Sequence, residues 1–134
     1  MVSSRKLALA EQFIELTRAR DWSRLELLSD DVVYRPIEQI TETGQYVGRE
    51  GFRSYMEGFT ESGWASSVDV GAATFLQVGD AVIVRIELAV RGRASGMQLA
   101  GRVFEVLHFD RETIVRVEDF LDREDALRAA ERPR

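Results

Sequence analysis

Residues 78–125, "VGDAVIVRIELAVRGRASGMQLAGRVFEVLHFDRETIVRVEDFLDRED", decide the fold. Apolar and β-branched residues dominate them, with polar residues interleaved, and short turn-like junctions interrupt them at "VGD", "RASG" and "FDRET". Together with the residues just before them, they predict four extended segments, at 64–77, 81–93, 97–109 and 113–121. Such short junctions favour antiparallel neighbours, so the second half of the chain predicts a long-stranded, curved antiparallel sheet.

The first half of the chain is helical in character. Residues 3–20 place apolar side chains at helical spacing, and Asp21 can cap a short second helix in "WSRLELL". A strand in "DVVYRP" and a polar loop at 37–48 follow, and "REGFRSYMEGF" after Gly48 predicts a third amphipathic helix. Asp122 can cap a last helix in "REDALRAAE". Helices that precede a run of strands predict an α+β domain in which helices cover one face of the sheet.

Composition excludes several classes of site. The 134 residues include 23 acidic and 18 basic side chains, a formal charge of −5 that disfavours nucleic acid or an anionic membrane as partner. Cysteine is absent and His108 is the only histidine, which leaves no basis for disulfides, thiolate chemistry or a multi-histidine metal centre within one chain. No signal peptide or membrane-spanning segment is predicted, and we expect a cytoplasmic protein.

Four stretches carry a resemblance to a known family: "SDDVVYRP", "YVGREGFRSYMEGF", "VGDAVIVRIELAVRGRASG" and "IVRVEDFLDREDALRAA". They are similar to the SnoaL-like branch of the nuclear transport factor 2-like superfamily. The resemblance covers nearly the whole chain and implies a single domain over residues 1–134. The fold it implies is an α+β cone, in which a curved antiparallel or mixed sheet wraps around the N-terminal helices and encloses a mostly apolar cavity. We also expect a homodimer formed through the outer face of the sheet.

One acid breaks the apolar pattern near the end of the sheet. In "IVRVEDFLDRED", Asp119 shares a face with aliphatic side chains, whereas Arg116 and Glu118 fall on the other face and are predicted to contact solvent. Asp119 is either a cavity carboxylate whose burial raises its pKa, or a structural partner of Arg85 or Arg102. Both interpretations stay open at this stage.

Other charged residues carry the same ambiguity. Glu105 lies on an otherwise apolar face of its strand, where an unpaired acid is costly, so we expect it in a pocket. Arg85 and Glu87 face away from a row of aliphatic residues, and they line either the cavity or the outer surface. His108 projects opposite to Glu105, which favours the outer face or a dimer interface over catalysis.

The resemblance implies three enzymatic possibilities. A steroid isomerase needs a phenol, a carboxylate base and a pocket acid, but here the first two positions correspond to Phe13 and Arg35, and only Glu105 fits. An epoxide hydrolase uses Arg-x-Asp on a central strand, and this chain has Arg85-Ile86-Glu87 there. It also uses a second acid on the last strand, which Asp119 matches. Tyr34 matches a tyrosine that helps to hold water in those enzymes. A polyketide cyclase needs a single cavity acid, which Asp119 or Glu105 supplies.

We therefore expect a protein that binds a small, largely apolar organic molecule. As an enzyme it is expected to use acid/base catalysis of the cyclase, hydrolase or isomerase type without metal or organic cofactor, through Asp119 and Glu105 first and Arg85 and Glu87 next. The alternative is a non-catalytic binding or accessory module of the same fold. The residues expected to line the pocket are Phe13, Tyr34, Phe52, Tyr55, Phe59, Trp64, Leu107 and Val117.

Overall fold

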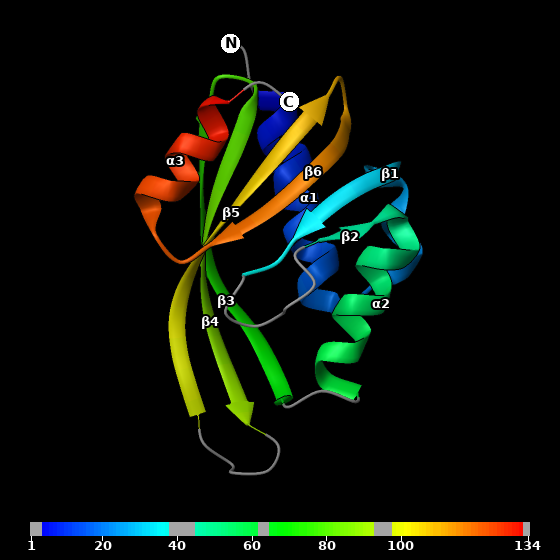
Figure 1. Ribbon diagram of the computed structural model, residues 1–134, viewed down its shortest axis with the longest axis vertical. Helices are drawn as coiled ribbons and strands as arrows, with labels where there is room; N and C mark the ends of the chain where they lie inside the picture. The colour runs from blue at the N-terminus through cyan, green and yellow to red at the C-terminus, as the bar shows by residue number, and fades with distance from the viewer. Residues whose placement is uncertain (1–3, 38–44, 62–64, 93–97, 133–134) are drawn as a thin grey trace.

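The computed structural model describes residues 4–37, 45–61, 65–92 and 98–132, which form an α+β domain (Figure 1). Its helices are α1 (Ser4–Ala19), the 3₁₀ helix η1 (Trp22–Leu27), α2 (Gly48–Glu61) and α3 (Arg123–Glu131). Its strands are β1 (Leu28–Arg35), β2 (Tyr46–Val47), β3 (Ala65–Val78), β4 (Ala81–Gly92), β5 (Gln98–Asp110) and β6 (Thr113–Phe120). The four predicted extended segments are thus confirmed as β3 to β6.

The six strands form one open sheet in the order β2-β1-β6-β5-β4-β3. Strands β3 to β6 form the predicted antiparallel meander, whereas β1 lies parallel to β6, so the sheet is mixed. The register pairs Val84 with Glu105 and Glu105 with Asp119. Paired residues project to the same face of a sheet, so these three side chains share one face.

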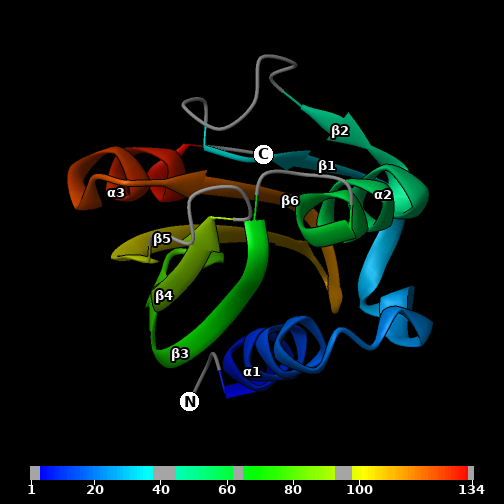
Figure 2. The ribbon, with the colours of Figure 1, turned by 90° about the horizontal axis from the view of Figure 1, so that it is seen from below.

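Helices α1 and α2 cover the concave face of the curved sheet (Figure 2). The buried stripe of α1 includes Phe13 and Ile14, and α2 contributes Phe52, whose ring lies 5.8 Å from that of Phe13. These side chains pack against the face of the sheet that carries Val84 and Leu107, and they form the main core with it. This arrangement confirms the prediction that N-terminal helices pack inside a curved sheet.

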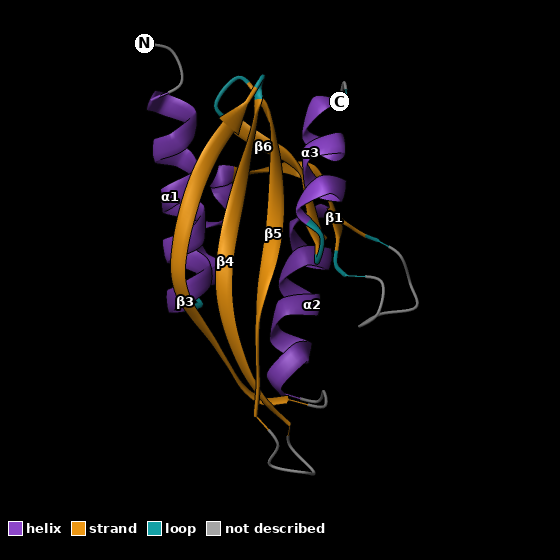
Figure 3. Cartoon of the chain, turned by 90° about the vertical axis from the view of Figure 1, so that its left-hand side faces the viewer, coloured by secondary structure: helices purple, strands orange, loops and turns teal. Residues whose placement is uncertain are grey.

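Helix α3 lies on the opposite side of the sheet from α1 (Figure 3). Its Ala126 and Ala129 pack against Ile83, Phe104 and Val106, which form a second, smaller core. The expectation that helices cover one face therefore holds for α1 and α2 but not for α3, since the outer face also carries an apolar patch. Association of two copies through this face stays a prediction.

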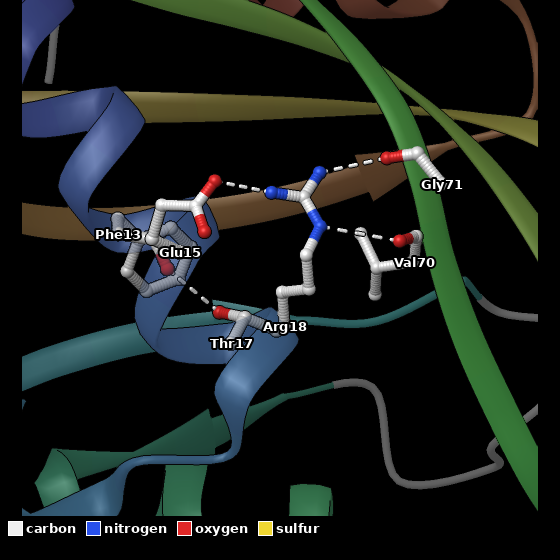
Figure 4. Close-up of polar contacts among 6 residues, drawn as sticks. All are labelled: Phe13, Glu15, Thr17, Arg18, Val70 and Gly71. Carbon is white, nitrogen blue, oxygen red and sulfur yellow. Dashed lines mark hydrogen bonds and ion pairs between the residues drawn. The ribbon is translucent and has the colours of Figure 1, made fainter.

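Hydrogen bonds from Arg18 connect the end of α1 to the edge strand β3 (Figure 4). Its Nε donates to the carbonyl of Val70 at 3.2 Å and its Nη2 to that of Gly71 at 2.7 Å, while Glu15 on the same helix pairs with Nη1. The β3–β4 register shifts between Val70 and Ala73, so the contact lies at a β-bulge. Arg18 thereby fixes the distance between two elements that enclose the cavity described below.

Two local features differ from the sequence-based expectations. The loop predicted at 37–48 includes the short strand β2, which pairs with β1, and residues 38–44 of that loop lie outside the described parts. The short helix after Asp21 forms as predicted, capped by the Asp21 carboxylate, but as a 3₁₀ helix. Both differences, the strand β2 and the 3₁₀ form of η1, concern segments of a few residues, where periodicity carries little information.

Gly48 turns the chain from β2 into α2. Its φ of +84° is a conformation that glycine adopts without strain.

Candidate functional site

Two carboxyl groups and a phenol meet on the inner face of the sheet. Glu105 on β5 and Asp119 on β6 are directly paired, so Asp119 faces the helices, as the alternation in its strand predicts. Tyr34 on β1 is buried, and its hydroxyl donates a hydrogen bond of 2.6 Å to Oδ2 of Asp119. Phe52 packs edge-on against the Tyr34 ring at 5.3 Å. The other oxygen, Oδ1 of Asp119, is buried without a hydrogen-bond partner among the described residues.

The surroundings raise the pKa of every acidic group in this cluster. Burial raises the pKa of the Glu105 carboxyl well above its ordinary value, and the charge of Asp119 raises it further. Burial also raises the pKa of Asp119, although hydrogen bonds from Glu105 and Tyr34 favour its ionised form and oppose the shift. Burial, followed by the negative potential of Asp119, raises the pKa of the Tyr34 and Tyr55 hydroxyls, so both phenols stay protonated.

Both carboxyl pKa values are raised, so we expect the Glu105–Asp119 pair to hold a single proton near neutral pH. Two adjacent carboxylates in a poorly solvated site repel each other too strongly for both to ionise. Glu105 has the more strongly raised pKa, so we expect it to keep the proton while Asp119 is ionised and accepts hydrogen bonds. A proton donor and a proton acceptor therefore stand side by side.

The Glu105→Gln variant is expected to match the wild type in stability at about pH 4 and to exceed it at about pH 8. The folded protein holds the Glu105 proton where the unfolded chain has released it, so the wild-type free energy of unfolding falls as pH rises above about 4.3, the ordinary pKa of Glu. Gln has no proton to release, and its amide can still donate to Asp119. Urea unfolding at both pH values measures the difference, which grows by up to about 1.4 kcal/mol per pH unit.

Glu87→Gln provides the matched control, because Glu87 is half-exposed on the outer face of the sheet. Its stability should follow that of the wild type at both pH values. Parallel pH dependences of Glu105→Gln and wild type would contradict the shared proton.

The carboxyl pair lines a cavity of about 130 Å³ between the sheet and the helices. Its other lining residues are mainly apolar or aromatic: Ile14, Thr17, Arg20, Trp22, Tyr34, Pro36, Ile37, Tyr55, Met56, Val70, Ile86, Leu88 and Val103. An apolar protein cavity of about 150 Å³ accommodates benzene, so this one has room for about a single ring.

The structure divides the predicted pocket residues into three groups. Tyr34 and Tyr55 line the cavity. Phe13, Phe52, Leu107 and Val117 belong to the buried core behind it. The Phe59 side chain and Trp64 lie outside the described parts of the chain. Most of the remaining lining residues come from α1, η1, β3 and β4, because the curvature of the sheet, which the sequence does not specify, decides which core residues border empty space.

A second hollow of about 300 Å³ lies where β1 and β6 end. Its lining is more acidic, with Glu118, Asp122 and Asp125 beside Arg35, and it shares Pro36, Ile37 and Asp119 with the inner cavity. It holds only one member of the carboxyl pair. The inner cavity is therefore the better candidate site.

Arg85 and Glu87 are not brought together with Asp119 and Glu105. They alternate with the inward-facing residues of β4 and project from the outer face, where Arg85 and Arg102 both lie within 4 Å of the Glu87 carboxylate, at 3.6 and 3.7 Å. The two arginines therefore pair with Glu87 rather than with Asp119. The spacing that resembles an epoxide hydrolase is present in the sequence but lies on the other side of the sheet from the cavity.

The prediction that Glu118 contacts solvent was wrong. The Glu118 side chain projects to the outer face but is only 2% exposed. Its carboxylate lies 3.2 Å from His108 Nε2, 3.3 Å from Arg116 Nε and 3.5 Å from Arg35 Nη1. Burial opposes its ionisation, but the hydrogen bond with His108 and the charge of Arg116 lower its pKa overall. His108 lies on the outer face, as predicted, and pairs there with Glu118. The parallel neighbour β1 supplies Arg35, a long-range contact that alternation cannot reveal.

Within the described parts of the chain, no group of three or more His, Asp or Glu residues is arranged to hold a metal ion. No helix in those parts is long and apolar enough to cross a membrane.

Comparison with known proteins identifies the scaffold. The family model of the SnoaL-like domain matches residues 10–117. The chain belongs to the SnoaL-like family. Comparison with curated protein sequences gave no significant match.

Solved structures share the fold of this SnoaL-like protein. An NTF2-like protein of unknown function from Burkholderia pseudomallei K96243 has a TM-score of 0.78 at 16% identity, over 97% of this chain and 100% of that one. TerC, co-crystallised with polyporic acid, has a TM-score of 0.76 at 17% identity, over 96% and 100%. A Pseudomonas putida KT2440 protein, provisionally named a polyketide cyclase, has a TM-score of 0.70 at 17% identity, over 90% and 93%. Identities this low establish the fold alone.

Proposed function

We propose that this SnoaL-like protein is a cofactor-independent enzyme that transfers a proton on a small, largely apolar organic molecule. Asp119 is the general base and Glu105 the general acid. The proposal rests on the direct pairing of Glu105 with Asp119, two carboxyl groups with raised pKa values at the wall of a mainly apolar cavity.

The pair suits acid/base catalysis because its members differ in protonation. Environments that push two carboxyl pKa values apart let one group donate a proton and its neighbour accept one at the same pH. Tyr34 and Glu105 both donate to Asp119, which orients the carboxylate. Oδ1 of Asp119 has no hydrogen-bond partner among the residues that the structure describes, and it would accept a proton from a bound molecule.

The neighbours suggest which compounds to test first. One of them was co-crystallised with polyporic acid and another is provisionally named a polyketide cyclase. Carbonyl compounds are a rational choice, since removal of a proton next to a carbonyl is a reaction that a positioned carboxylate catalyses. The cavity volume of about 130 Å³ favours compounds with one ring over fused polycycles.

The experiment measures deuterium exchange next to the carbonyl of cyclohexanone and acetophenone in D₂O by NMR. Wild-type protein is expected to accelerate exchange of at least one compound above the buffer rate, and Asp119→Asn to abolish that acceleration. Binding without acceleration would favour the alternative, a non-catalytic ligand-binding module. Acceleration that persists in Asp119→Asn would show that another group is the base.

A further inference from the structure

Two titratable side chains are buried on the outer face of the sheet, opposite the candidate site. Glu118 and His108 are only 2% and 4% exposed, and neither lines the inner cavity. His108 Nε2 lies 3.2 Å from Oε1 of Glu118. On the other carboxylate oxygen, Oε2, Arg116 Nε lies at 3.3 Å and Arg35 Nη1 at 3.5 Å. We call these four residues the outer-face cluster, and the proposed proton transfer gives none of them a role.

The outer-face cluster spans three neighbouring strands. Arg35 belongs to β1, Glu118 and Arg116 to β6, and His108 to β5, and these strands lie side by side (Figure 1). Burial raises the pKa of Glu118, but the hydrogen bond with His108 and the charge of Arg116 lower it by more, so the carboxylate is ionised. A buried carboxylate that leaves its basic partners loses their compensating charge, which is costly. Glu118 therefore stays in contact with the strands on both sides of its own.

The ion pair between β1 and β6 lies directly behind a hydrogen bond of the candidate site. The register pairs Arg35 with Glu118, and the ladder between the two strands is irregular before this point. Consecutive residues of a strand project to opposite faces. Tyr34 and Asp119, the chain neighbours of Arg35 and Glu118, therefore meet on the inner face, where the phenol donates to the carboxylate at 2.6 Å. The same two strand ends thus form an ion pair outside and a hydrogen bond inside.

We propose that Glu118 is a positioning residue for the general base: its ion pair with Arg35 fixes β1 against β6, and this keeps the Tyr34 hydroxyl where it orients Asp119. The inference rests on the proposed function for the role of Asp119 and adds a residue that contacts no molecule in the inner cavity. A displacement of about 1 Å in a catalytic group can cost about 100-fold in rate, so the support behind the group matters.

The first experiment observes the Tyr34 hydrogen bond and needs no substrate. NMR spectra are recorded at about pH 7 on protein labelled with ¹³C at the tyrosine Cζ atoms, and Tyr34→Phe assigns the signal. Asp119→Ala gives the signal position in the absence of the hydrogen bond. Glu118→Gln keeps the shape of the side chain but removes its charge, and it is expected to move the Tyr34 signal at least about half of the way to that position.

Arg35→Met is the second variant, and it carries the test if Glu118→Gln does not fold. Met removes the β1 end of the ion pair and leaves Glu118 its contacts with His108 and Arg116. It too is expected to move the Tyr34 signal. Arg35 makes a further interaction in the protein, so the double variant is needed to isolate the pair. Arg35→Met with Glu118→Gln is expected to move the signal no further than Arg35→Met alone.

Glu87→Gln is the matched control. Glu87 is also an outer-face glutamate between two arginines, with Arg85 at 3.6 Å and Arg102 at 3.7 Å, but it lies on β4. Its substitution should leave the Tyr34 signal in place. A signal that stays in place in both Glu118→Gln and Arg35→Met, or that moves as far in Glu87→Gln, would overturn the inference.

The second experiment measures catalysed deuterium exchange and separates this inference from the proposed function. Glu118→Gln is expected to lower kcat about 10-fold and to change KM less than about 2-fold, because the apolar wall of the cavity is unaltered. An unchanged kcat, with exchange that still depends on Asp119, would overturn the role of Glu118 alone. A displaced Tyr34 signal without exchange by the wild type would overturn the proposed function but support the positioning of Tyr34 by Glu118.

Discussion

The Asp119→Asn variant is expected to lower catalysed proton exchange by about 10²- to 10⁴-fold, the contribution of a positioned general base. Asn has nearly the same shape and can still accept the hydrogen bond from Tyr34, but its amide does not take up a proton at neutral pH. The rate with each carbonyl compound, followed by NMR in D₂O, measures the loss. Because the substitution removes a carboxyl whose pKa is raised by burial, the folded state should not be destabilised near neutral pH.

Asp69→Asn is the control for this experiment, since Asp69 is an exposed acid on β3. The same isosteric change there should leave the exchange rate unaltered. A loss of less than about 10-fold in Asp119→Asn would argue against a general base at this position.

Phe52→Ala is expected to lower the free energy of unfolding by about 3–5 kcal/mol. The Phe52 side chain is only 1% exposed, and its ring contacts those of Phe13, Trp22 and Tyr34 at centroid distances of 5.8, 6.0 and 5.3 Å. Its removal would leave a cavity at the point where α1, η1, α2 and β1 meet. Urea unfolding measures the loss, and the variant should also bind ligands less tightly, since Phe52 positions the Tyr34 ring beside Asp119.

Phe120→Ala is the comparison, because Phe120 is only partly buried and packs against the second core. Its loss of stability should be clearly smaller. Equal losses at the two positions would show that the aromatic cluster around Phe52 has no special part in the stability of the domain.

The orientation of Glu105 and Asp119 toward the inner face was predictable from local sequence, but their direct pairing was not. Period-two alternation places Asp119 and Glu105 on the apolar side of their strands, which the structure confirms. The sequence does not specify the register, so it could not show that the two residues are directly paired. Nor could it show that Tyr34, on a strand far away in the chain, donates to Asp119. These contacts depend on tertiary structure, which local periodicity does not encode.

For charged residues on the outer face, local sequence predicted neither the orientation nor the burial reliably. Alternation left the orientation of Arg85 and Glu87 open, and family resemblance drew attention to them as catalytic candidates. The structure places them outside, where both are about half-exposed. Glu118 was expected to contact solvent because it alternates with the apolar residues of its strand, yet it is buried among three basic side chains. A face that is polar in sequence can still be covered when neighbouring strands supply compensating charge.

The left-handed conformation of Arg20, at φ 56° after the end of α1, had no sequence signal. Helix ends in this conformation are recognised by glycine or asparagine, and arginine followed by aspartate does not indicate one. Arg20 lines the inner cavity because of where α1 stops relative to β3, a distance that the Arg18 contacts with Val70 and Gly71 fix.

We expect Glu105 and Asp119 to share one proton at neutral pH. NMR titration of the side-chain carboxyl carbons in ¹³C-labelled protein measures this, with Glu105→Gln and Asp119→Asn used to assign the signals. The pair is expected to lose its two protons in well-separated steps, the second of them above about pH 7 and dominated by Glu105. Titration of both carboxyl groups below about pH 5, as in unperturbed side chains, would contradict it.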